Sequence, residues 1–183
     1  MLKVGISGKI ASGKSEVENI LQKLNYKVFD LDILVHKLFD EDENIKEKIK
    51  NKFNTLDRKE IASIVFSNEN KKKALEGILY PKLKEIILNI FDENKNEEMI
   101  FISGALLFKS GFYKLFDKTI FINADDKIRL KRLMKRNNLD KNIAQKRLNL
   151  QDDGSLANFI IENNENIEEL EKNVLNIINS IKK

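Results

Sequence analysis

Short apolar runs alternate with amphipathic stretches along most of the chain. Five runs of four or five residues read as buried strands, at residues 2–6, 27–30, 99–103, 118–122 and 158–161. Segments with helical periodicity separate most of these runs. Strands that alternate with helices predict an α/β fold, in which helices cover both faces of a parallel sheet.

Two helical patterns are especially clear. Apolar residues at positions 17, 20, 21 and 24 predict a helix from near Lys14 to near Asn25. The last helix carries one apolar stripe, made of Ile167, Leu170, Val174, Ile177, Ile178 and Ile181. Residues 33–98 differ from both flanks, because they have helical periodicity and no convincing strand. We interpret them as a helical insertion between the second and third strands, with the polar stretch 92–98 as its exit loop.

Composition narrows the class of protein. The chain has 183 residues, enough for one domain, and its 42% hydrophobic and 34% charged residues are ordinary for a soluble protein. No apolar run is long enough for a transmembrane helix, and the start MLKVGIS has no signal-peptide pattern. The chain has no cysteine, which excludes disulfides, thiolate metal sites and cysteine nucleophiles. We therefore expect a cytoplasmic protein with no membrane partner.

The net charge of +4 comes from 33 basic and 29 acidic residues, which are interspersed. A pI of about 9.0 can indicate nucleic-acid binding. The interspersed charges favour a lysine-rich solvated surface with some phosphate-binding arginines as the cause, so we expect no nucleic-acid partner. A nucleic-acid-binding protein would instead show steeply salt-dependent affinity for DNA or RNA.

One motif specifies the chemistry. Residues 8–15 read Gly8-Lys9-Ile10-Ala11-Ser12-Gly13-Lys14-Ser15 and fit G-x-x-x-x-G-K-[ST], between a predicted strand and an amphipathic helix. Glycine is needed where a Cβ would collide with a phosphate, and the loop N–H groups and helix N-terminus hold the anion. Lys14 would reach the β- and γ-phosphates of ATP, and the Ser15 hydroxyl would bind Mg²⁺. All eight residues are candidate ATP-binding residues.

The motif at residues 8–15 is a P-loop, which occurs in several classes of nucleotide-binding protein. The residues that follow it discriminate between these classes. No N/T-K-x-D run is present, which argues against a GTPase, and Ser103-Gly104-Ala105 provides no acid where an ATPase has its Walker B aspartate. Asp30 and Asp32 instead follow the second strand. Their spacing places both on one side if the backbone is still extended, so a carboxylate could face the γ-phosphate. The alternative is that both are loop or helix-capping residues.

A second basic cluster lies at residues 126–136. On a helix, Arg129, Arg132 and Arg136 share one face, which suits phosphate oxygens. The alternative is a solvated basic face. In residues 137–151, which follow this cluster, Asp140 would cap a short helix and Arg147 is a further basic candidate. The only histidine, His36, lies one helical turn after Asp32 and is either structural or able to approach the phosphates.

Along nearly its whole length the sequence resembles dephospho-coenzyme A kinases. The resemblance rests on an ordered series of segments: VGISGKIASGKS, KVFDLDILVHKL, Leu56-Asp57-Arg58 through Val65-Phe66, Ala74-Leu75-Glu76, Leu106-Leu107-Phe108, Arg132 with Arg136, Gln151, and Phe159 to Asn163. Only the P-loop is specific on its own, and the order of the weaker matches separates this family from other kinases.

The resemblance implies a P-loop NTPase three-layer sandwich with five parallel strands in the order 2-3-1-4-5. The P-loop core would span about 1–32 and 99–183, with a helical acceptor-binding insertion at about 33–98 and a lid at about 137–151.

The implied reaction phosphorylates dephospho-coenzyme A with ATP and Mg²⁺. Asp32 would be the general base and, with Ser15, a metal ligand. Lys14 and Arg136 would neutralise charge, Arg132 and Arg136 would bind ATP, and the enzyme would be a monomer or weak homo-oligomer.

Some residues depart from the family pattern. Tyr80-Pro81 replaces its His-Pro, Ala105 and Lys109 flank the LLF segment in place of Pro and Glu, and Arg129 stands where glutamine is common. In the P-loop, Gly8-Lys9-Ile10-Ala11 replaces Gly-Gly-x-Gly. Two alternatives therefore stay open: another P-loop small-molecule or nucleotide kinase, and a nucleotide-binding protein with reduced activity.

Overall fold

The computed structural model describes residues 1–138, 140–148 and 154–182. These residues form two compact units. We call residues 1–30 together with 96–183 the core unit, and residues 31–95 the helical unit. Each unit has its own secondary structure, and the P-loop lies in the core unit.

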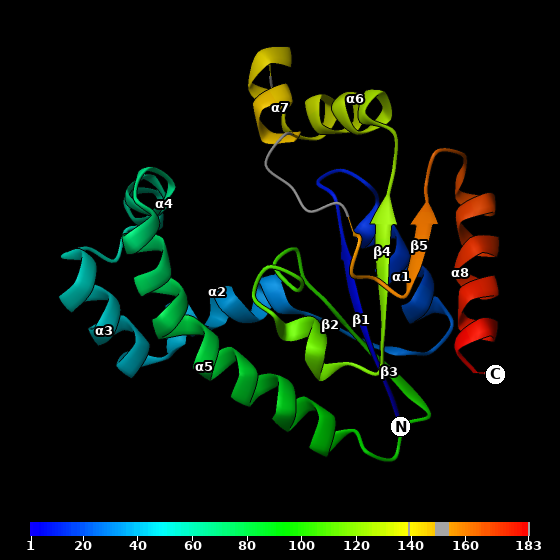
Figure 1. The fold of residues 1–183 in the computed structure, drawn as a ribbon, viewed down its shortest axis with the longest axis horizontal. Coiled ribbons are helices and arrows are strands. Elements are labelled where there is room, and N and C mark those ends of the chain that lie inside the picture. The colour runs from blue at the N-terminus through cyan, green and yellow to red at the C-terminus, as the bar shows by residue number, and fades with distance from the viewer. Residues whose placement is uncertain (139, 149–153, 183) are drawn as a thin grey trace. The chain divides into compact units, whose positions relative to one another are not determined.

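Five parallel strands form the sheet of the core unit (Figure 1). They are β1 (Leu2–Gly8), β2 (Lys27–Asp30), β3 (Met99–Ser103), β4 (Lys118–Asn123) and β5 (Phe159–Glu162), in the order β2-β3-β1-β4-β5. The α/β fold class and the strand order are thus confirmed. β1 is two residues longer than expected, because Ser7 and Gly8 continue the ladder with Phe121 and Ile122 of β4. β5 is shifted one residue toward the C-terminus, to pair Glu162 with Asn123.

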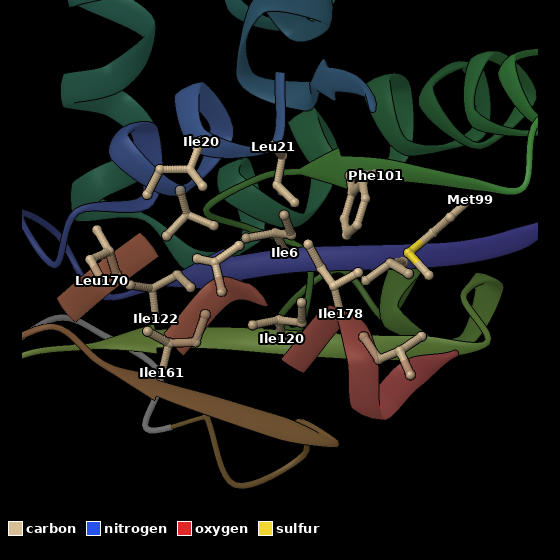
Figure 2. Close-up of a cluster of buried hydrophobic side chains, with 14 residues drawn as sticks. Ile6, Ile20, Leu21, Met99, Phe101, Ile120, Ile122, Ile161, Leu170 and Ile178 are labelled. Atoms are coloured by element: carbon tan, nitrogen blue, oxygen red, sulfur yellow. The ribbon is translucent and has the colours of Figure 1, made fainter. Parts of the chain in front are cut away.

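One face of the sheet packs against α1 (Lys14–Lys23) and α8 (Ile167–Ile181). Figure 2 shows how side chains of β1, β4 and α8, such as Ile6, Ile120 and Ile178, point into this layer. Each fully buried aliphatic side chain contributes about 1.5–3 kcal/mol. The predicted stripe of α8 is mostly buried, but Ile167 is 43% exposed. It is the first residue after the N-cap, Asn166, and so lies at the end of the packed region.

The opposite face contacts the connection between β3 and β4, which contains the short 3₁₀ helix η1 (Phe112–Leu115). Leu107, Phe108 and Phe121 form a buried cluster there, with Phe116 packed against it. A Cβ at Gly5 would lie 3.1 Å from Phe116 ring atoms, so the absence of a side chain lets the ring approach β1.

The helical unit contains α2 (Leu31–Glu41), α3 (Glu43–Phe53), α4 (Arg58–Ser67) and α5 (Glu69–Glu93). Asp42, Asp57 and Asn68 each accept a backbone N–H at a helix start, which fixes three of the four N-termini. The expected exit loop was too long, because α5 continues through 92 and 93 before Asn94 caps it. None of the helices in the described part of the chain combines the length and the apolar character needed to cross a membrane.

Candidate nucleotide-binding and catalytic site

The P-loop connects β1 to α1, and its glycines are required by close contacts. A Cβ at Gly8 would lie 2.7 Å from the Ile122 carbonyl oxygen of β4. Gly13 has a left-handed backbone with φ 101°, and a Cβ there would lie 2.2 Å from the Asn163 amide nitrogen. α1 begins directly after Gly13, so its N-terminal N–H groups adjoin the loop. This is the arrangement that binds phosphate anions.

Ala11 also has a left-handed backbone, with φ 59°. For a residue with a Cβ this conformation costs about 1–2 kcal/mol relative to the right-handed region. Ala11 and Ile10 pack against a buried cluster formed by Leu133, Ala144 and Leu148. Ala11 therefore has a strained backbone at the position where the family resemblance expects glycine, and the apolar packing of its side chain stabilises this conformation.

Lys14 is surrounded by groups from three elements. Its Nζ lies 2.7 Å from Glu18 Oε1 of α1 and 4.0 Å from Asp30 Oδ2 at the end of β2. It also donates to the Ser103 hydroxyl at the end of β3, at 3.4 Å. The side chains of Lys14 and Glu18 are only 15% and 13% exposed. Sequence reasoning missed Glu18, although its spacing of four residues from Lys14 on a predicted helix was a usable signal.

The Glu18 carboxylate competes with phosphate for the Lys14 ammonium, and a Glu18→Gln substitution is expected to remove this competition. The Kd for ATP should fall by about threefold to tenfold, since such an ion pair is worth about 1 kcal/mol. Titration with ATP by calorimetry measures the change. Glu16→Gln is the matched control, because Glu16 is exposed in the first turn of the same helix. Weaker ATP binding by Glu18→Gln would instead mean that Glu18 orients Lys14 productively.

The arginine-bearing helix is α6 (Asp126–Asn137). Arg129 is only 2% exposed, donates to Asp126 Oδ1 at 2.7 Å and reaches the Ile10 carbonyl at 3.4 Å. Its guanidinium lowers the pKa of the Asp126 carboxyl through that hydrogen bond. Arg129 is therefore not part of a solvated face.

Arg132 Nη1 lies 3.4 Å from the Ser12 carbonyl oxygen, whereas Arg136 is exposed near the end of α6.

α7 (Lys141–Leu148) follows α6 and packs against it through the cluster of Leu133, Ala144 and Leu148. Asp140 caps α7 as expected, because its Oδ1 accepts the Asn142 N–H at 2.7 Å. Gln151 and the side chain of Arg147, two further candidates from the sequence, lie outside the described residues.

Comparison with known proteins shows the family to which this chain belongs. A family model described as dephospho-CoA kinase matches residues 2–169. The chain belongs to the dephospho-CoA kinase family. The dephospho-CoA kinase of Oceanobacillus iheyensis is 31% identical over 191 residues, which cover 97% of this chain and 96% of that protein.

Solved structures agree with membership of the dephospho-CoA kinase family. The dephospho-CoA kinase from Campylobacter jejuni matches with a TM-score of 0.71 and 31% identity, over 98% of this chain and 96% of that chain. Shikimate kinase from Acinetobacter baumannii, solved with shikimate, has a TM-score of 0.59 and 15% identity over 100% of this chain and 95% of that chain. The second likeness shows the fold alone.

The two acidic residues expected of a dephospho-CoA kinase, Asp30 and Asp32, belong to different units. β2 ends at Asp30, and Leu31 already begins α2, so Asp32 lies in the first turn of a helix. The backbone is therefore not extended across the pair, and the condition for both carboxylates to lie on one side is not met. A carboxylate in the first turn is favoured by the helix dipole. His36 makes a local contact in the same helix, because its Nδ1 lies 2.7 Å from the Asp32 carbonyl oxygen.

The departures from the dephospho-CoA kinase pattern have distinct surroundings. Burial and the neighbouring Glu76 raise the pKa of the Tyr80 phenol, so Tyr80 stays neutral. Ala105 and Lys109 are both exposed, whereas Leu107 and Phe108 between them are buried. The charge change at Lys109 therefore affects a surface position of this segment and leaves its core contacts in place.

The side chains that the resemblance implies as metal ligands carry oxygen donors, which suit Mg²⁺. Ser15 supplies a hydroxyl at the start of α1, and Asp32 supplies a carboxylate in the first turn of α2. Across the described residues, no group of three or more His, Cys, Asp or Glu side chains could hold a metal ion by itself. Mg²⁺ in kinases does not need such a group, because it binds through one or two carboxylates, water and the substrate phosphates.

Proposed function

We propose that this member of the dephospho-CoA kinase family transfers the γ-phosphoryl group of ATP to the ribose 3′-hydroxyl of dephospho-coenzyme A. The products are ADP and coenzyme A. The observation that carries the proposal is the P-loop. Gly8 and Gly13 lie where a Cβ would clash with neighbouring atoms, and Lys14 is the first residue of α1. The family assignment selects the acceptor, because kinases with this fold use many different acceptors.

Phosphoryl transfer depends on positioning and on charge neutralisation. In the proposed site, the backbone of residues 8–15 and Lys14 would hold the ATP phosphates. Arg132, whose Nη1 lies 3.4 Å from the Ser12 carbonyl oxygen, and Arg136 of the same helix would add positive charge for ATP binding. Ser15 and Asp32 would hold Mg²⁺, which supplies further positive charge to the β- and γ-phosphates. Asp32 would accept the proton of the ribose hydroxyl, as a general base does.

The other parts of the chain take supporting roles in this proposal. The helical unit would bind the acceptor, and residues 137–151 would close over ATP and exclude water, so that the phosphoryl group reaches the alcohol. Asp140 gives the start of α7 a defined cap within that segment. We place the enzyme in the cytoplasm, as a monomer or weak homo-oligomer without nucleic-acid or membrane partners.

An acceptor panel tests the proposal directly. ADP release is measured by a coupled assay with ATP and Mg²⁺, using dephospho-coenzyme A, shikimate, gluconate and AMP as parallel acceptors. Turnover with dephospho-coenzyme A alone is the expected result. Preference for another acceptor would contradict the assigned substrate. ATP binding without turnover on any acceptor would support the alternative of reduced activity.

A further inference from the structure

Asn163 is a buried polar residue to which the reaction above assigns no role. It follows β5 directly and is 5% exposed. Its backbone N–H donates to the Asn123 carbonyl at the end of β4, at 2.9 Å. Its side-chain Nδ2 donates to the Ser12 carbonyl oxygen in the P-loop, at 2.7 Å. Asn163 therefore connects the rigid edge of the sheet to the loop.

The contact also explains the second glycine of the motif. A Cβ on Gly13 would lie 2.2 Å from Asn163 Nδ2, well inside contact distance. Gly13 is thus needed both for its left-handed φ of 101° and for the space that the Asn163 amide occupies. Any side chain at position 13 would displace Asn163 or the loop.

The hydrogen bond has a consequence for the phosphate site, because a trans peptide is planar and its C=O and N–H point in opposite directions. The Ser12 carbonyl oxygen faces two donors, Asn163 Nδ2 at 2.7 Å and Arg132 Nη1 at 3.4 Å. The Gly13 N–H of this peptide is therefore directed away from these two side chains. Donors on the carbonyl also polarise the peptide and strengthen its N–H as a donor.

We propose that Asn163 is a positioning residue for ATP: it fixes the Ser12–Gly13 peptide so that the Gly13 N–H donates to the phosphates. The inference rests on the proposed function, because it deepens the role of the P-loop in that reaction. Asn163 acts through the loop and does not itself contact the transferred group.

Asn163→Ala and Asn163→Asp test the proposal. Alanine removes the donor, and aspartate keeps the size but places an oxygen against the Ser12 carbonyl. We expect the Kd for ATP, measured by calorimetry, to rise about tenfold or more in both variants, since a misdirected hydrogen bond to a charged group costs about 1.5–3 kcal/mol. The KM for dephospho-coenzyme A should change less than about twofold, because uniform loss of ATP binding leaves the acceptor site intact.

Asn158→Ala is the matched control for a purely structural role. Asn158 precedes β5 at its other end, and its Oδ1 accepts the Thr119 N–H at 2.8 Å and the Thr119 hydroxyl at 3.1 Å. This variant should lower the melting temperature and leave the Kd for ATP unchanged. If Asn163→Ala behaves like Asn158→Ala, the proposal is overturned. If Asn163→Ala does not fold, the same measurement on Asn163→Asp decides.

The two proposals can fail separately. ATP titration needs no acceptor, so it reports on Asn163 whether or not dephospho-coenzyme A is the substrate. A wild-type chain that binds ATP and ignores dephospho-coenzyme A would contradict the assigned reaction alone. Variants of Asn163 that bind ATP as tightly as wild type, with normal melting temperatures, would contradict the positioning role alone.

Discussion

Replacing Lys14 by alanine is expected to abolish phosphoryl transfer. The ammonium group is the fixed counter-charge for the β- and γ-phosphates, and removing one preorganised partner of a developing charge typically costs about 10²–10³-fold in kcat. Here the loss should exceed that range, because Glu18 and Asp30 would then lie near the phosphates without the lysine between them. ADP release at saturating ATP and dephospho-coenzyme A gives the measurement.

Lys23→Ala is the control, because Lys23 is an exposed residue in the last turn of the same helix. It should retain wild-type turnover. Melting temperatures of both variants separate a catalytic loss from unfolding, since Lys14 also makes an ion pair within α1. Near-normal turnover by Lys14→Ala would show that the P-loop assignment is wrong.

Asp32→Asn is expected to lower kcat by about 10²–10⁴-fold while ATP binding survives, if Asp32 is the general base. The amide keeps the size of the side chain but cannot accept the proton of the ribose hydroxyl. Asp32 lies in the first turn of α2, so the loss of its favourable interaction with the helix dipole should cost only about 0.3–1 kcal/mol of stability. Turnover at saturating substrates and the melting temperature are both measured.

Asp30→Asn is the comparison that separates the two acids. Asp30 lies 4.0 Å from Lys14, so its substitution should change the Kd for ATP more than kcat. A larger loss of kcat in Asp30→Asn than in Asp32→Asn would reverse the roles. If neither variant slows turnover by about tenfold, carboxylate base catalysis does not operate, and Mg²⁺ with the arginines must carry the reaction.

Local patterns identified the strands and helices because each depends on residues close in the sequence. The five apolar runs, the helix after Lys14 and the cap at Asp140 all needed only neighbours to be recognised. The junction after β2 was harder. Leu31 and Asp32 continue an apolar–polar alternation that fits an extended strand, yet the helical repeat of α2 begins there. Residues shared by two patterns leave such a boundary ambiguous.

Contacts between distant residues account for what the sequence did not reveal. Asn163 contacts Ser12 across 151 positions, and no local periodicity marks it. Arg129 was recognised as part of a basic face, but its burial depends on the loop at Ile10, 119 positions away. Glu18 differed, because its spacing from Lys14 is local and the ion pair could have been anticipated.

The strand order has a consequence for how the chain is made. β1 and β2 are not neighbours, because β3 lies between them. The partner strands of β1 are β3 and β4, so no sheet pairing can form until the ribosome has synthesised the helical unit and then residues 99–103. Non-local pairings of this kind form slowly, whereas helices form from local contacts. The helical unit can therefore acquire structure on the nascent chain first, while the P-loop must await the emergence of β3 and β4.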